Sequence, residues 1–143
     1  RCLALAAGTV GVRPVKQGRG KMRDRWFNYL HVTCGGQTLL HRRGGGDIWQ
    51  GLYEFPLIET DKAADFAELA ATAAFRELLG NGRWHLRRSV TMPGHQLSHQ
   101  LLHAVFHRIE CDAMPAFPSV ETAALGGYAL PRLVDRYLTK YQM

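Results

Sequence analysis

The sequence has 143 residues, of which 46% are hydrophobic, and its formal net charge is +6. A chain of this length can bury one substantial core, so we expect one globular domain plus a tail. The apolar stretch at residues 2–7 is far too short to span a bilayer and lacks a basic flank, which argues against a secreted or membrane protein. Because the sequence starts at Arg1 and not at Met, we expect a fragment of a longer protein.

The three cysteines are widely spaced and odd in number, at Cys2, Cys34 and Cys111. This usage favours neither a disulfide framework nor a zinc site with paired cysteines. A reducing, intracellular setting is therefore expected.

All of the excess positive charge lies in the first 25 residues. This segment has one acid, Asp24, and seven basic residues: Arg1, Arg13, Lys16, Arg19, Lys21, Arg23 and Arg25. The rest of the chain is neutral. The segment also contains several glycines and no apolar periodicity, so we expect a basic linker over residues 1–22. Such a run is either a solvated tail or a set of phosphate contacts whose affinity falls with salt.

The elements expected in the first half of the chain are two strands, a loop and a helix. Residues 26–32 and 37–42 are typical of two strands that surround a glycine-containing turn. Residues 44–56 are too aromatic for an ordinary solvent loop and are expected to fold over the core. Asp65 and Glu68 have the spacing of a capping box, which predicts a helix that ends near Gly80.

In the second half we expect a strand over 84–92, a turn or loop over 93–96 and a strand over 100–110. Apolar residues between 130 and 138 recur at helical spacing, and Pro131 suits a first helical turn. Hairpin, helix, strands and helix together predict a mixed α+β domain.

Four motifs carry a resemblance to a known family. They are residues 25–30 (RWFNYL), 47–56 (DIWQGLYEFP), 95–99 (HQLSH) and 128–131 (YALP). Their order and spacing resemble the C-terminal domain of MutY-type adenine DNA glycosylases. The resemblance implies a Nudix-like fold, a mixed β-sheet flanked by helices, over residues 23–143. It also makes residues 1–22 a connector from a preceding catalytic domain.

The resemblance implies a function in base-excision repair. The family's parent enzyme removes adenine mispaired with 8-oxoguanine or guanine, and its catalytic carboxylates belong to the preceding domain, so no catalytic residue is expected in this chain. Cys2 resembles the last ligand of a [4Fe-4S] cluster, which needs about four thiolates and cannot form on this cysteine alone. We expect no cofactor in the fragment, and as partners duplex DNA with 8-oxoguanine opposite adenine and the catalytic domain of the same chain. We also expect a monomer in the bacterial cytoplasm, at the nucleoid.

The lesion-reading loop implied by the resemblance is Leu97-Ser98-His99, preceded by His95 and Gln96. 8-Oxoguanine has a proton on N7 and a carbonyl at C8, and a serine hydroxyl can accept from the first and donate to the second. Ser98 is therefore the expected lesion contact, supported by His99, and Leu97 stands where the family usually has phenylalanine. Phosphate contacts are expected from the basic residues that precede the loop in sequence: Lys16, Arg19, Lys21, Arg23 and Arg25.

Two further functions are compatible with parts of the sequence, an active Nudix pyrophosphohydrolase and a protein-interaction module. Nudix hydrolases bind divalent metals through clustered glutamates on one helix. The chain keeps Glu68 and Arg76-Glu77-Leu78 at that spacing, but Gly80 and Asn81 replace the next pair of glutamates and Lys62 replaces a glycine. Hydrolysis is therefore not expected, and helix capping by Glu68 is the competing interpretation.

Four histidines, at positions 95, 99, 103 and 107, recur every fourth residue. On a helix they would form a metal-binding stripe. On the predicted strand, residues four apart are separated by about 13 Å, which is too far for one metal ion.

Overall fold

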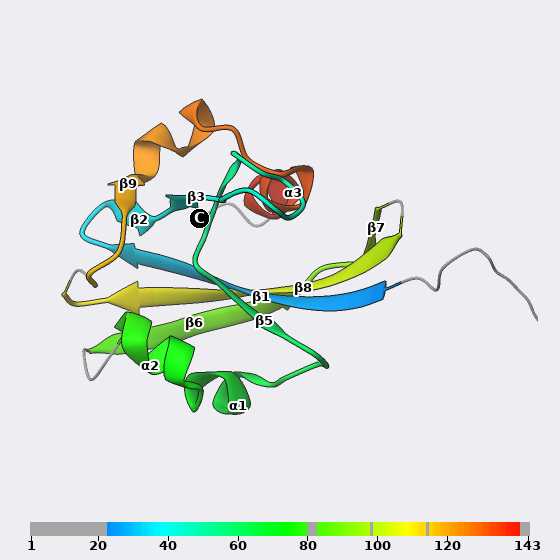
Figure 1. Cartoon of the computed structure of the whole chain (residues 1–143). Helices are drawn as coiled ribbons and strands as arrows, with labels where there is room; N and C mark the ends of the chain where they lie inside the picture. Colours follow the sequence, from blue (N-terminus) through cyan, green and yellow to red (C-terminus); the bar gives the residue numbers. More distant parts are fainter. Residues whose placement is uncertain (1–22, 80–82, 98, 114, 141–143) are drawn as a thin grey trace, which may run out of the picture.

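A computed structural model describes residues 23–79, 83–97, 99–113 and 115–140. Over these residues the chain forms one seven-stranded mixed sheet, a separate two-stranded sheet and four helices (Figure 1). The elements in chain order are β1 Arg23–Cys34, β2 Gln37–Leu39, β3 His41–Arg42, β4 Tyr53–Glu54, β5 Leu57–Thr60, α1 Phe66–Ala70, α2 Ala73–Leu79, β6 Trp84–Thr91, β7 His95–Leu97, β8 Gln100–Cys111, β9 Ser119–Glu121, η1 Thr122–Gly127 and α3 Arg132–Lys140. No helix in the described part of the chain has the length and apolar character needed to cross a membrane. The predicted α+β domain, a mixed sheet with flanking helices, is confirmed.

The long strands β1 and β8 run parallel through the middle of the large sheet, whose order is β6-β8-β1-β2-β9. Their register runs from Arg23 opposite Gln100 to Thr33 opposite Glu110. β5 pairs with the middle of β1, and β7 pairs with the start of β8. β1 and β8 pair directly with β2, β5, β6 and β7. Residues at the ends of β1 and β8 are therefore positioned by the most extensively paired strands of the fold.

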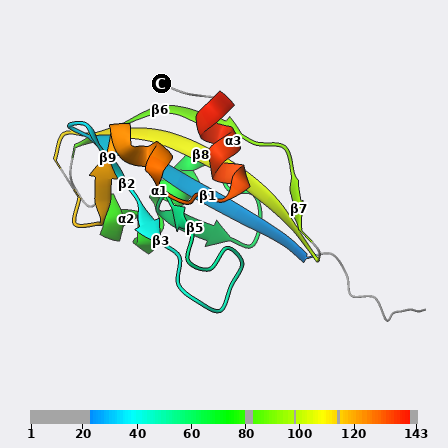
Figure 2. The same cartoon turned by 90° about the horizontal axis from the view of Figure 1, so that it is seen from above.

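Side chains alternate between the two faces of the sheet, and each face has its own core. α3 covers one face, and α1 with α2 covers the other, as Figure 1 shows; the turned view in Figure 2 places α3 above β1 and β8. Under α3, the ring of Phe106 stacks on Tyr29 with centroids 5.0 Å apart and on Tyr137 with centroids 4.0 Å apart. On the other face Leu30, Ile109 and residues of α1 and α2 are buried together.

The helix predicted from the capping box is two helices in the structure. The box itself is confirmed: the backbone N–H of Glu68 donates to Asp65 Oδ1 (2.8 Å), and that of Asp65 donates to Glu68 Oε1 (3.2 Å). α1 then ends at Ala70, because the Thr72 hydroxyl donates to Leu69 O (2.7 Å) and accepts from the Phe75 N–H (3.2 Å). A hydroxyl that bonds locally to the backbone in this way competes with a continuous helix.

The two strands predicted at the start of the chain are confirmed in part. The turn between β1 and β2 has Gly35 at φ 55° and Gly36 at φ 84°, the left-handed pair that a tight hairpin requires. The second predicted strand divides, however: β2 stays in the large sheet, while β3 pairs with β4. β4, β5, β9 and the helix η1 were not predicted, whereas the predicted final helix is α3.

Candidate nucleic-acid interface

The predicted lesion-reading residues lie on a hairpin formed by β7 and β8. His95, Gln96 and Leu97 pair with Leu102, Leu101 and Gln100. The hairpin extends from the sheet at the end where β1 begins (Figure 1). There the backbone N–H of Arg23 donates to His99 O (3.0 Å), so the first described residue is bonded to the hairpin.

The prediction of a turn or loop over Pro93–Gln96 was wrong for its last two residues. His95 and Gln96 belong to β7, because the first residues of β8 extend past β6 and offer a partner strand. A three-residue strand is too short to show alternation in sequence, and its stability comes from that pairing.

The structure divides the predicted contact residues by exposure. Gln96, His99 and Arg23 are exposed, whereas Leu97 is half-buried and packs against the core beneath α3. Leu97 therefore anchors the hairpin. The remaining expected contacts, Ser98, Lys16, Arg19 and Lys21, and the expected cluster ligand Cys2 lie outside the described residues.

Arg25 does not have the phosphate-binding position that was expected for it. It is only 5% exposed, and its five N–H donors all have partners within the chain. Nε and Nη2 donate to Glu59 (both 2.7 Å), Nη1 and Nη2 to Asp47 (2.9 and 2.8 Å), and Nη1 to Gln100 (2.9 Å). The carboxylates of Glu59 and Asp47 raise the pKa of Arg25 far above its usual range. Arg25 joins β1, β5, β8 and the glycine-rich loop (residues 44–51). No N–H donor of Arg25 remains for a phosphate.

The glycine-rich loop, residues 44–51, is also fixed from the core side. Arg43 donates to both carboxylate oxygens of buried Glu54 (2.8 and 2.9 Å) and to Ile48 O (2.9 Å). Trp49 in this loop has φ 59°, a left-handed conformation that a bulky side chain rarely adopts. Packing offsets this strain: Trp49 contacts Phe27, with ring centroids 6.1 Å apart.

His95 links the hairpin to this loop and to α3. Its ring lies 6.1 Å from that of Trp49. Burial, followed by the positive charges of Arg136 and Arg132, lowers the pKa of His95, so the imidazole is neutral at physiological pH. Arg132, Arg136 and Lys140 occur at every fourth residue of α3 and share one helix face. This basic stripe was missed in the sequence, although its spacing was visible there.

The NUDIX domain family model matches residues 28–140. The chain belongs to the NUDIX domain family. No sequence among the curated proteins matches the chain.

Solved structures share the fold of this NUDIX domain at low sequence identity. The C-terminal domain of mouse MUTYH, solved in complex with human PCNA, has a TM-score of 0.62 at 16% identity and covers 82% of this chain and 87% of its own. The Nudix hydrolase RenU of M. smegmatis has a TM-score of 0.59 at 12% identity, covering 86% and 85%. MutT of Methanosarcina mazei has a TM-score of 0.55 at 15% identity, covering 84% and 96%.

The residues at the metal-binding positions of Nudix hydrolases do not suit a divalent metal ion in this NUDIX domain. Glu68 caps α1, Glu77 is exposed on the separate helix α2, and the next two carboxylate positions are Gly80 and Asn81. Within residues 23–79, 83–97, 99–113 and 115–140, no three histidine, cysteine or acidic side chains are grouped to hold a metal.

The two histidines in the described part of β8 contact different neighbours. His103 stacks on Trp26 (4.7 Å between ring centroids), and its Nε2 lies 2.9 Å from Asp24 Oδ1. His107 is buried against Phe66, and its Nδ1 lies 2.7 Å from the Ser89 hydroxyl. The regular spacing of these histidines therefore reflects separate packing positions along a strand and not a shared metal site.

Proposed function

We propose that this NUDIX domain is the C-terminal lesion-recognition domain of a MutY-type adenine DNA glycosylase, and that it reads 8-oxoguanine opposite the adenine to be removed. The parent enzyme would cleave the glycosidic bond in a preceding domain, whose iron–sulfur cluster would include Cys2. This domain would contribute binding, not chemistry.

The observation that carries the proposal is the β7–β8 hairpin. It extends from the sheet beside the start of β1, and it presents Gln96 and His99 to solvent on a scaffold anchored by Leu97. The basic segment 1–22 precedes β1 directly, so a strand bound at the hairpin would lie near positive charge. The fold shared with the mouse MUTYH domain supports the same function, and the missing glutamates argue against a hydrolase.

Replacing Ser98 with alanine in the intact glycosylase tests this function. The hydroxyl is the group proposed to contact N7 and O8 of the lesion, and a pair of such contacts discriminates by about 1–3 kcal/mol. We expect the preference for 8-oxoguanine:adenine over guanine:adenine duplexes to fall about 10-fold or more. The measurement is the ratio of the affinities for the two duplexes.

Ser119→Ala is the matched control, because Ser119 is a partly exposed serine on β9, at the other edge of the large sheet from β6, and its hydroxyl makes only a long contact with Gln37 (3.4 Å). It should leave the ratio unchanged. An unaltered preference in Ser98→Ala would remove the role given to this serine.

The hydrolase alternative predicts turnover that this proposal does not. The chain incubated with Mg²⁺ and either 8-oxo-dGTP or dGTP should release no monophosphate or pyrophosphate, because Gly80 and Asn81 replace two metal-binding glutamates. Product formation can be followed by chromatography. Turnover that disappears in Glu77→Gln would establish hydrolysis and contradict the proposed function.

A further inference from the structure

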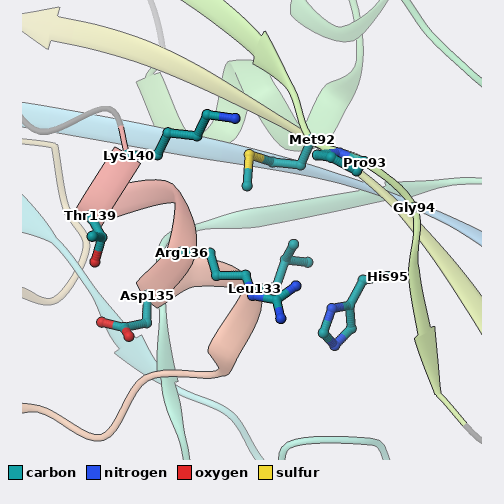
Figure 3. Close-up of a pocket in the computed structure, with 9 residues that line it drawn as sticks. All are labelled: Met92, Pro93, Gly94, His95, Leu133, Asp135, Arg136, Thr139 and Lys140. Carbon is teal, nitrogen blue, oxygen red and sulfur yellow. The ribbon is translucent and has the colours of Figure 1, made fainter.

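A pocket of about 470 Å³ lies between α3 and the segment that joins β6 to β7 (Figure 3). Met92, Pro93 and His95 line one side, and Leu133 and Arg136 line the other. The volume is within the range of small-molecule sites, about 300–1,000 Å³. Of the predicted lesion-strand contacts His95 lines this pocket, and the metal-binding positions of the family do not.

The pocket combines an apolar floor with a basic wall. Met92 and Leu133 are 7% and 2% exposed. Arg136 and Lys140 line the wall that α3 forms. Arg132 lies one turn before Arg136 on the same face of this helix. In Figure 3 the guanidinium of Arg136 is turned toward the His95 ring, while the carboxylate of Asp135, which also lines the pocket, is turned away from that ring. This arrangement suits a ligand with an anionic group and an apolar or planar part.

The electrostatics at His95 agree with this geometry. The positive charges of Arg136 and Arg132 add to burial in lowering the pKa of His95. Trp49, whose ring lies 6.1 Å from that of His95, is uncharged. The positive charges of the two arginines attract an anion. The neutral imidazole can donate a hydrogen bond to that anion through its N–H group, and it avoids the free-energy cost of burying a charged imidazolium.

The position of the pocket near the hairpin favours a DNA strand as the source of the anion. His95 is the first residue of β7 and Leu97 is its last, so the pocket is about 7 Å along the strand from the end of β7. A DNA strand advances about 3.4 Å per nucleotide along the helix axis. A strand whose lesion base meets the hairpin would therefore bring a nucleotide a few positions away to the pocket.

We propose that this pocket binds one nucleotide of the lesion-bearing DNA strand, with its phosphate between Arg136 and His95 and its sugar and base against Met92 and Leu133. This inference rests on the proposed function. The pocket would contact the DNA strand without recognising its base sequence. It would fix the register of that strand, so that the lesion base lies opposite the hairpin.

The first arm of the test follows the His95 imidazole of this chain by NMR as pH is varied. Thymidine 5′-monophosphate at millimolar concentration should raise the pKa of His95, because a bound phosphate offsets the two arginines, whereas thymidine should leave it unchanged. The increase should be lost in Arg136→Gln. It should persist in Arg76→Gln, which changes an exposed arginine of α2 on the far side of the sheet. No increase with the monophosphate, or an equal increase with inorganic phosphate, overturns the nucleotide site.

The second arm measures DNA binding by the intact parent protein and separates a DNA strand from a free nucleotide. Arg136→Gln should weaken binding to lesion and undamaged duplexes by the same factor, and reduce the slope of log affinity against log salt by about 0.9. If Arg136→Gln abolishes monophosphate binding but leaves DNA affinity unchanged, the site takes free nucleotides and the proposal fails.

The two proposals can fail separately. Wild-type DNA binding in Arg136→Gln, together with lost lesion preference in Ser98→Ala, removes the pocket assignment and keeps the lesion reading. Uniformly weaker binding in Arg136→Gln, with unchanged preference in Ser98→Ala, does the reverse.

Discussion

Replacing Arg25 with methionine is expected to lower the free energy of unfolding by about 2–4 kcal/mol. Methionine keeps an unbranched stem like that of arginine but lacks the guanidinium group and all five donors. Asp47 and Glu59, which are 39% and 34% exposed in their side chains, would then face each other without the cation between them. Their partial exposure to water moderates the cost, which for a fully buried pair would be larger.

Chemical denaturation of Arg25→Met and Arg23→Met measures this effect against a matched control. Arg23 is the exposed arginine two residues earlier on the same strand, and its loss should change stability by less than about 0.5 kcal/mol. The assignment of Arg25 to the fold fails if the two variants are equally stable. It also fails if Arg25→Met weakens DNA binding while it unfolds like the original chain.

Arg25 illustrates what a charge count cannot provide. In the sequence it is one of seven basic residues in a charged segment, and although it begins the RWFNYL motif, its charge does not distinguish it from Arg23. Its partners are 22, 34 and 75 residues away, at Asp47, Glu59 and Gln100. Only the pairing of β1 with β5 and β8 brings these groups together, so the role of Arg25 is a property of the topology.

The elements that were predicted are those with a local cause. The glycine pair turns β1 into β2, the Asp65–Glu68 box starts α1, and an apolar stripe forms α3. The elements that were missed are short: β4 pairs with β3, β5 with β1, β7 with β8 and β9 with β2, and η1 is one 3-10 helix of six residues. Two- and three-residue strands have no periodicity of their own, and distant pairing decides them.

The candidate site shows the same division. The hairpin residues were identified through a motif, which gives residue order but not exposure, and the structure separates exposed His99 from half-buried Leu97. α3 was predicted from its apolar face alone. A role for its basic face could be inferred only from the structure, which places Arg136 across a pocket from His95, 41 residues earlier in the sequence.

Acidification from about pH 6.5 to about pH 5 is expected to destabilise the domain, because two histidines are buried in the neutral form. Burial, helped by Arg108 and Arg88, lowers the pKa of His31 from 6.5 to about 3, and burial alone lowers that of His107 to about 4. In this pH range the unfolded chain binds protons at both residues and the folded chain does not. Stability is therefore full above about pH 6.5 and falls with pH by as much as about 1.4 kcal/mol per pH unit for each histidine.

The pH dependence of the free energy of unfolding, measured in denaturant, tests this expectation. His107→Phe should remove one share of the slope while it preserves the aromatic contact with Phe66, and His31→Phe should remove the other, although it also removes the contact between His31 Nδ1 and the Tyr137 hydroxyl (2.8 Å). His85→Gln, at an exposed histidine of β6, should keep the full slope. Equal slopes in all three variants would mean that these imidazoles bind protons in the folded domain. The two faces of the sheet would then admit charge at His31 and His107, contrary to the packing that surrounds them.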